Sequence, residues 1–288
     1  MIHKIFILAP TRDLTDEGIK AVSIVERISR LSGLSHYEDG SKLKTPDTLD
    51  VSVGTVRLPG TPENKTVLLD NEFARLKDID NMFSLLDKCL VYSEKQRHIV
   101  SEHTPSKRVE VIKPFCIYPI KKGIAKNISE NFVFYIPPNI TNPRDMTIVL
   151  RSFLSSFDIN DKVALAVYSK NSQEILSIVN DAKNSLSRYA QDYYPEIMIL
   201  DDLEELHIRG HCMIDASGSF VVNVQTMHGI RHGNGVIATD NNALLDWVPK
   251  GRISICKSHN VMHFIGGEKA SIPVMCEYDL SRIMIETF

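Results

Sequence analysis

The stretch that decides the fold is residues 210–249, which read GHCMIDASGSFVVNVQTMHGIRHGNGVIATDNNALLDWVP. The apolar run at 212–215 predicts a strand, residues 224–232 predict a helix, and residues 236–239 predict a second strand. Two strands joined by a crossover helix form a βαβ unit, in which the strands run parallel. This stretch therefore predicts an α/β protein with a parallel sheet.

The same alternation continues on both sides of this stretch. Upstream and downstream of it, expected strands cover residues 132–136, 163–168 and 197–200, and expected helices cover residues 145–157, 172–189, 202–206 and 279–288. Nearer the start of the chain, the pattern predicts strands at 2–8, 51–56, 66–69, 89–93 and 109–112 and helices at 18–31, 82–87 and 94–103.

Residues 118–130, YPIKKGIAKNISE, interrupt the alternation with three lysines, a glycine and little periodicity. We interpret this break as a boundary between domains. The prediction is a first domain at 1–118, a linker at 119–130 and a second domain at 131–288, whose last helix packs back on the first domain. Each domain is expected to be a doubly wound parallel sheet, with a ligand cleft between the two.

The composition excludes several classes of protein. A hydrophobic content of 43% is too high for a disordered chain, and a net charge of −3 excludes a uniformly basic nucleic-acid binder. Five scattered cysteines without a Cys-x-x-Cys pair argue against a disulfide framework or a zinc site. No apolar run approaches the roughly 20 residues of a membrane span. These features predict a cytoplasmic protein.

Several nucleotide and catalytic motifs are absent. The sequence lacks GxxxxGK[ST], GxGxxG and GxSxG, which disfavours a phosphate loop, a Rossmann dehydrogenase and a hydrolase of the nucleophile-elbow type. His228 and His232 have the i, i+4 spacing of metal ligands, but no Glu follows His228 as in H-E-x-x-H. We therefore expect no metal.

Three segments together resemble one family. Residues 89–114 (CLVYSEKQRHIVSEHTPSKRVEVIKP), residues 139–153 (NITNPRDMTIVLRSF) and residues 210–249 resemble segments of GT-B glycosyltransferases of the glycogen-synthase-like group. The resemblance implies two Rossmann-like domains facing across a cleft. It also implies a hexosyl- or pentosyltransferase that uses a nucleotide sugar, a UDP-sugar, as co-substrate and needs no tightly bound cofactor.

The chain departs from this family at three positions. Two glutamates, eight residues apart in the family, correspond to Phe220 and His228, and a basic residue corresponds to Asn139. The divergence resembles that of phage DNA-glycosylating enzymes, which implies a 5-hydroxymethylated pyrimidine in DNA as acceptor and the host cytoplasm as location. The alternatives are a glycan or lipid acceptor, or a degenerate GT-B domain that only binds.

The resemblance places the donor site in the second half of the chain. Arg144, beside Pro143, opens a helix where a guanidinium would bind the diphosphate and stabilise it as a leaving group. In the same site, Asn139 and His228 take the places of family ligands, with His228 toward the ribose. The loop Ser217-Gly218-Ser219 and Asn223 would offer backbone N–H groups. The alternatives are a surface arginine, a packed helix histidine and an ordinary turn with an N-cap.

The acceptor side is expected in the first half. Asp70 follows a strand at its carboxyl end and is the candidate general base, with Asp13 and Glu94 as rivals. An Asx turn is the alternative for Asp70. Arg12 follows the first strand, from which it would contact a phosphate. Trp247, the only tryptophan, either stacks on a base or packs in the core.

Overall fold

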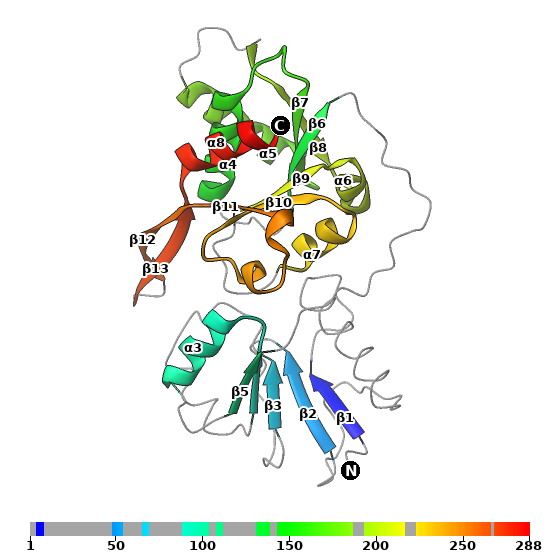
Figure 1. Cartoon of the computed structure of the whole chain (residues 1–288). Helices are drawn as coiled ribbons and strands as arrows, with labels where there is room; N and C mark the ends of the chain where they lie inside the picture. The colour runs from blue at the N-terminus through cyan, green and yellow to red at the C-terminus, as the bar shows by residue number, and fades with distance from the viewer. Residues whose placement is uncertain are drawn as a thin grey trace. The chain divides into compact units, whose positions relative to one another are not determined.

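The structure is a computed structural model that divides into two compact units (Figure 1). The smaller unit comprises Met1–Ile117 with Phe220–Val224, and the larger comprises Tyr118–Ser219 with Gln225–Phe288. The structure describes residues 4–8, 48–53, 65–68, 88–103, 108–111, 131–138, 143–186, 193–216, 223–265 and 268–288. The predicted linker at 119–130 lies outside these residues, so the proposed domain limits stay a prediction.

The smaller unit contains a five-stranded parallel sheet with the strand order β1-β2-β3-β4-β5. One helix, α3 (Glu94–His103), joins the last two strands, as predicted. The predicted helices at 18–31 and 82–87 lie outside the described residues. The strands are β1 (Lys4–Leu8), β2 (Thr48–Val53), β3 (Lys65–Leu68), β4 (Lys88–Val91) and β5 (Arg108–Val111).

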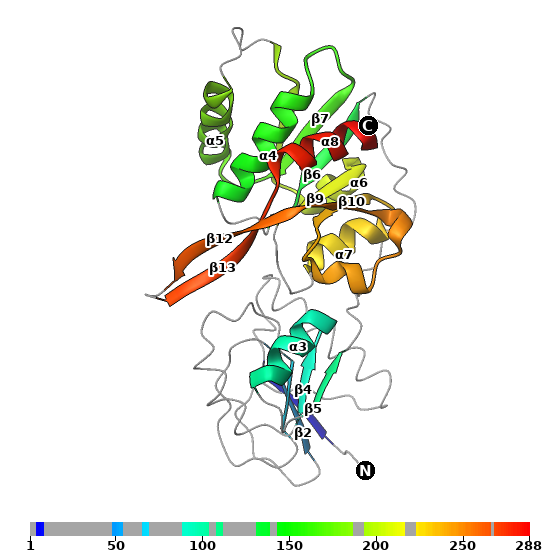
Figure 2. The ribbon, with the colours of Figure 1, turned by 60° about the vertical axis from the view of Figure 1, so that its left-hand side comes forward.

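The larger unit contains a six-stranded parallel sheet with the strand order β11-β10-β9-β6-β7-β8 (Figure 2). Read from β8, this is the order 3-2-1-4-5-6 of a doubly wound Rossmann-like sheet. Two parallel sheets in one α/β chain confirm the predicted fold class. The strands are β6 (Phe132–Ile136), β7 (Val163–Tyr168), β8 (Glu196–Leu200), β9 (Cys212–Asp215), β10 (Gly235–Thr239) and β11 (Ile253–Cys256).

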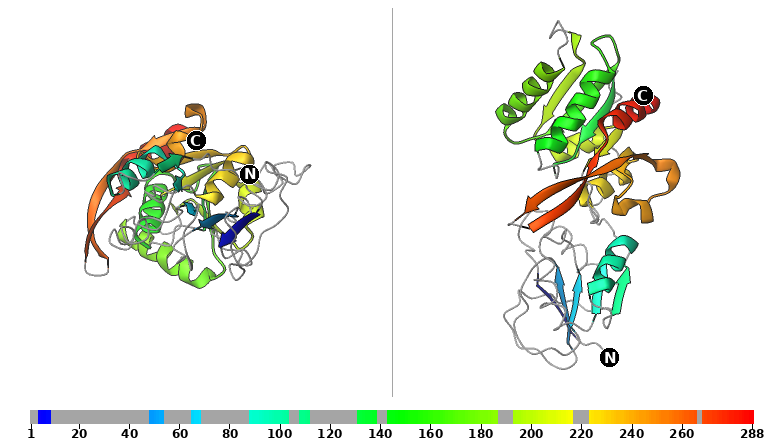
Figure 3. Two further views of the ribbon diagram at one scale, coloured as in Figure 1. Left: turned by 90° about the horizontal axis from the view of Figure 1, so that it is seen from below. Right: turned by 90° about the vertical axis from the view of Figure 1, so that its left-hand side faces the viewer.

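Helices cover both faces of the six-stranded sheet (Figures 2 and 3). Phe134 and Ile136 of β6 are fully buried in a core formed with α4 (Pro143–Ser156), α5 (Ser172–Ser185) and α8 (Glu277–Thr287). Tyr135 points to the opposite face because side chains alternate along a strand. That face is covered by α6 (Leu203–Arg209) and α7 (Val224–Arg231).

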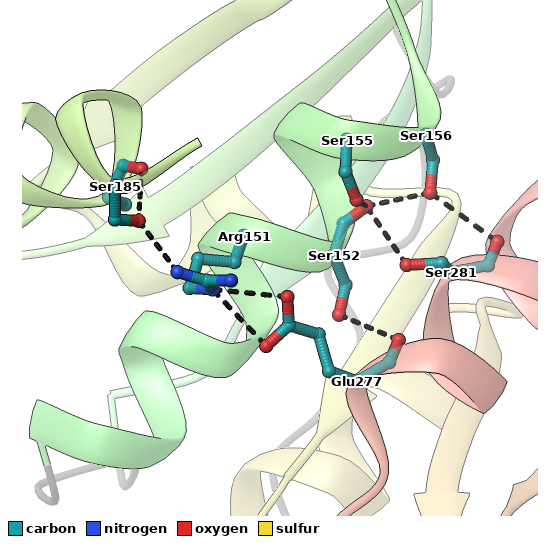
Figure 4. Close-up of polar contacts among 8 residues, drawn as sticks. Arg151, Ser152, Ser155, Ser156, Ser185, Glu277 and Ser281 are labelled. Atoms are coloured by element: carbon teal, nitrogen blue, oxygen red, sulfur yellow. Dashed lines mark hydrogen bonds and ion pairs between the residues drawn. The ribbon is translucent and has the colours of Figure 1, made fainter. Parts of the chain in front are cut away.

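The last helix is fixed within the larger unit by a polar seam (Figure 4). Arg151 of α4 donates from Nε to both carboxylate oxygens of Glu277 in α8, at 3.0 and 3.2 Å, and from Nη1 to Ser185 in α5 at 2.8 Å. Ser152 donates to the carbonyl oxygen of Glu277 at 3.1 Å. These bonds join α4, α5 and α8 above their shared core. A contact of α8 with the first domain stays a prediction.

The sequence analysis missed the elements between β10 and α8. Two short 3-10 helices, η2 (Ala243–Asp246) and η3 (Lys250–Arg252), precede β11. After β11 comes a hairpin of antiparallel strands β12 (Ser258–Ile265) and β13 (Glu268–Met275), which projects as an arm from the larger unit (Figures 2 and 3). No helix among the described residues is long and apolar enough to cross a membrane.

Candidate functional site

The six-stranded sheet reverses its strand order between β6 and β9. These strands are neighbours, with Phe134 opposite Cys212 and Tyr135 opposite Met213. The chain leaves the carboxyl end of β6 to form α4 on one face, and leaves the carboxyl end of β9 to form α7 on the other. Ligands of open parallel sheets bind at such a switch point, where the N–H groups of helix N-termini favour an anion.

Arg144 lies in the first turn of α4, beside this switch point. Its Nε lies 3.3 Å from Oδ1 of Asp145, and Nη2 lies 3.4 Å from the same oxygen. These are long hydrogen bonds and therefore weak ones. A cation at a helix N-terminus is unfavourable for the helix dipole, and the neighbouring carboxylate partly offsets that cost. Its role as diphosphate ligand stays a prediction.

The first turn of α7 is tied to the end of β9 by a buried hydrogen bond. The Thr226 hydroxyl donates to Oδ2 of Asp215 at 2.8 Å, and both residues are fully buried. Asn223, the residue before this helix, is also buried. The sequence analysis missed Asp215 as a site candidate, although a carboxylate at the end of an apolar strand is visible in the sequence.

The ring of His228 lies at the contact between α6 and α7. Its centroid is 5.7 Å from that of His207 in α6 and 6.3 Å from that of His232. His207 and His232 are stacked, with 5.7 Å between centroids and an interplanar angle of 11°. The structure thus shows the packing contacts of His228, and a role in ribose binding stays a prediction. The described residues contain no group of three or more His, Cys, Asp or Glu that could hold a metal ion.

Burial keeps the imidazoles of His207 and His228 neutral. Desolvation lowers the pKa of His207 to about 4, helped by the nearby His228 and His232 and opposed by the hydrogen bond to Gln225. Desolvation also lowers the pKa of His228 to about 4, with smaller contributions from His232 and Arg231 and an opposing one from Glu204. Neutral imidazoles can both donate and accept hydrogen bonds, which suits a polar core.

Two further polar groups at the carboxyl edge of β10 escaped the sequence analysis. Thr239 ends this strand and Asn242 follows it, and both residues are buried. Within the part of the chain that the structure describes, Oγ1 of Thr239 and Nδ2 of Asn242 have no hydrogen-bond partner. A buried polar atom without a partner costs about 1–3 kcal/mol.

Other predicted site residues are placed as follows. Glu94 begins α3 and is exposed, in an ion pair with Arg97 at 2.6 Å. Trp247 is half-buried and follows η2, where its backbone N–H donates to the carbonyl oxygen of Leu244 at 2.9 Å. Outside the described residues lie Arg12, Asp13, Asp70, Asn139, Ser217, Gly218, Ser219 and Phe220.

Comparison with solved structures finds the same two-unit fold in GT-B glycosyltransferases. TarM is 12% identical with a TM-score of 0.56, over 84% of this chain and 48% of TarM. Anabaena Alr3699/HepE, solved with UDP and glucose, is 8% identical with a TM-score of 0.55, over 88% of this chain and 86% of HepE. WaaG, a glycosyltransferase involved in lipopolysaccharide biosynthesis, is 10% identical with a TM-score of 0.53, over 96% of this chain and 75% of WaaG.

These likenesses establish the fold. The chain spans about half the length of TarM, at 48%. No model of a protein family matches the sequence, and a comparison with curated proteins gives no significant match.

Proposed function

We propose that the protein is a nucleotide-sugar-dependent glycosyltransferase that moves a sugar from a UDP-sugar to a hydroxyl group. One observation carries this proposal: the N-termini of α4 and α7 follow neighbouring strands at the switch point, with Arg144 in the first turn of α4. This arrangement suits a diphosphate, and the similarly folded HepE has been solved with UDP and glucose.

The chemistry follows from the leaving group. The bond between the anomeric carbon and the diphosphate oxygen breaks, and a bond from that carbon to the acceptor oxygen forms. Negative charge grows on the diphosphate, so the Arg144 guanidinium and the helix N–H groups lower the barrier. The acceptor hydroxyl gives its proton to a general base, for which Asp70 is the proposed residue.

For the acceptor, we propose a hydroxyl of a glycan or glycolipid. The support comes from WaaG, which is involved in lipopolysaccharide biosynthesis and matches 96% of this chain. The hydroxymethylated pyrimidine in DNA, which the sequence favoured, has no corresponding support among these structures. It remains as a second arm of the experiment.

The experiment starts with donor binding and then follows transfer. Thermal shift should show stabilisation by UDP and not by UMP or NAD, because UMP lacks the diphosphate that the proposed ligands bind, and NAD does not carry the uridine of the proposed donor. A panel of UDP-sugars is then incubated with glycan acceptors, with hydroxymethylcytosine DNA and with unmodified DNA, and mass spectrometry detects the added sugar.

The outcomes separate the alternatives. A sugar added to a glycan acceptor supports the proposal, whereas a sugar on hydroxymethylcytosine assigns DNA as acceptor. UDP binding without transfer to any acceptor indicates a domain that only binds. The absence of any thermal shift with UDP would show the whole proposal to be wrong.

A further inference from the structure

A chain of buried hydrogen bonds runs from Asn234, the residue before β10, to the first turn of α7. Asn234 donates from Nδ2 to the Tyr135 hydroxyl and to the carbonyl oxygen of His207, both at 2.9 Å. The Tyr135 hydroxyl lies 3.1 Å from Nδ1 of His207, and Nε2 of His207 lies 3.3 Å from Oε1 of Gln225. Asn234 and Tyr135 are fully buried, and His207 and Gln225 are 1% and 6% exposed.

The direction of each bond fixes the protonation state of His207. The Asn234 amide donates to the Tyr135 oxygen. Because Oε1 of Gln225 can only accept, Nε2 of His207 carries the proton of that bond, and the Tyr135 hydroxyl donates to Nδ1. Nδ1 is therefore an acceptor, and the single imidazole proton sits on Nε2. From there it is donated to the Gln225 carbonyl oxygen. The network is complete only while His207 is neutral, in the Nε2–H tautomer.

The chain of bonds ends in the first turn of α7. Gln225 is the second residue of that helix, and the next residue, Thr226, donates to Asp215. Two consecutive residues thus tie this turn to α6 on one side and to β9 on the other. Gly229, one turn later, lets the helix approach closely, because a Cβ there would collide with the Tyr135 hydroxyl.

We propose that His207 is a positioning residue for the donor: held neutral between Tyr135 and Gln225, it fixes the first turn of α7, and uptake of a second proton releases that turn and weakens donor binding. This inference rests on the proposed function, because it assigns the first turn of α7 to the diphosphate. Beyond the proposed function, it assigns a role to His207 of α6 and predicts that donor binding depends on pH.

The surroundings of His207 disfavour a second proton. His228 and Arg231 of α7, and His232 just after this helix, bring further positive or protonatable groups. Glu204 of α6 is the acidic group that acts on His228. A proton on Nδ1 would also displace the Tyr135 proton from its acceptor. The low pKa of His207, about 4, agrees with this geometry and places the change near pH 4.

The test measures UDP affinity by calorimetry between pH 3.5 and 7.5 for the wild type and for His207→Gln. We expect the dissociation constant of the wild type to be insensitive to this group above about pH 5 and to rise below it, by up to about tenfold per pH unit below pH 4, because one proton is taken up. The variant, which cannot titrate at this position, should lose that dependence. The phosphate of UDP itself titrates near pH 6, and the difference between the two proteins removes this common contribution.

Two controls make the test specific. His211→Gln changes a histidine outside the network, whose Nδ1 accepts from the Val133 N–H at 3.0 Å, and should keep the wild-type pH profile. Tyr135→Phe removes the proton donor to Nδ1 and should move the loss of affinity to higher pH. Nitrogen-15 NMR of the wild-type histidines should show His207 as the Nε2–H tautomer at pH 7, with or without UDP.

The outcomes distinguish the two proposals. An Nδ1–H tautomer, or a pH profile that is the same in His207→Gln and the wild type, would overturn the positioning role while leaving the proposed function intact. Failure of the wild type to bind UDP at pH 7.5 would overturn the proposed function and this inference together. If His207→Gln does not fold, the NMR tautomer and the Tyr135→Phe profile still decide the matter.

Discussion

In the proposed function, Arg144 is the residue on which donor binding depends most directly. Replacing it with alanine should weaken UDP binding by about 1.5–3 kcal/mol, because a hydrogen bond between charged groups is lost. Arg151→Ala is a matched control: it lies two turns along the same helix, has a similar exposure of 32% against 29%, and is also paired with a carboxylate. Calorimetry with UDP checks the prediction, and equal affinity of both variants would remove Arg144 from the site.

The hydrogen bond between Thr226 and Asp215 carries a second prediction at the residue scale. Thr226→Val keeps the shape of the side chain but removes the donor to a fully buried carboxylate. The free energy of unfolding should fall by about 1–3 kcal/mol, the cost of leaving a buried polar group without this partner. Thr226→Ser keeps the hydroxyl and should lose clearly less. Denaturation in urea measures both, and equal losses would contradict the role of the hydroxyl.

The sequence predicts residue roles only where neighbours in the chain determine them. The sequence placed Arg144 at the beginning of a helix, as the structure shows, and its role as a diphosphate ligand stays a prediction. The network of His207 was not predicted, because its partners Tyr135, Gln225 and Asn234 come from three other parts of the chain. The same limit applies to His228, whose ring contact with His207 depends on how α6 and α7 pack.

At the scale of the element, the position of α7 depends on the close approach of Gly229 to Tyr135. Gly229→Ala adds a Cβ that meets the Tyr135 hydroxyl. The better helix propensity of alanine, about 1 kcal/mol, is outweighed by overpacking, which costs about 1–3 kcal/mol. We expect a less stable protein and weaker UDP binding, measured by urea denaturation and calorimetry.

A double-mutant cycle separates this collision from a general loss of helix stability. Tyr135→Phe removes the oxygen that the new methyl group would meet. The stability loss of the double variant Gly229→Ala/Tyr135→Phe should therefore be smaller than the sum of the two single losses. Additive losses would show that Gly229 is not needed for the approach to Tyr135.

Most described elements follow the sequence pattern closely, and the missed ones have a physical explanation. Apolar runs predicted β6, β7 and β9 to the residue because these central strands are buried on both faces. The hairpin β12–β13 was missed although Gly266-Gly267 between two β-rich runs is a hairpin signal. Both of its strands lie outside the parallel sheet, where the alternation of strands and helices gives no guidance.

At the scale of the whole molecule, the two parallel sheets were predictable but their strand order was not. Alternating strands and helices require parallel sheets, whereas the order β11-β10-β9-β6-β7-β8 depends on where each crossover places its strand. The switch point between β6 and β9, and with it the joint position of α4 and α7, appears only in the folded chain. The family resemblance supplied this arrangement as an expectation that spacing alone would not give.

The buried histidine His207 makes the stability of the larger unit depend on pH. Its pKa of about 4 lies below the usual value of 6.5, so the unfolded chain binds more protons than the folded one between these values, and stability falls as pH falls through that range. From pH 7 to pH 5 this histidine alone should lower the free energy of unfolding by about 2 kcal/mol. His228, whose pKa is lowered in the same direction, adds to the loss.

Trp247 makes this prediction measurable in the intact chain, because it is the only tryptophan and lies in the larger unit. Urea denaturation followed by its fluorescence at pH 7 and pH 5 should show the loss in the wild type and a smaller loss in His207→Gln. Asp279 does not add to this loss of stability. Hydrogen bonds from the Lys257 N–H and from Arg282 lower its pKa, so its contribution to the free energy of unfolding is present above about pH 4 and is lost only at stronger acidity. A wild type equally stable at both pH values would mean that His207 is not held neutral on folding, and the hydrogen-bond directions assigned to its network would then be wrong.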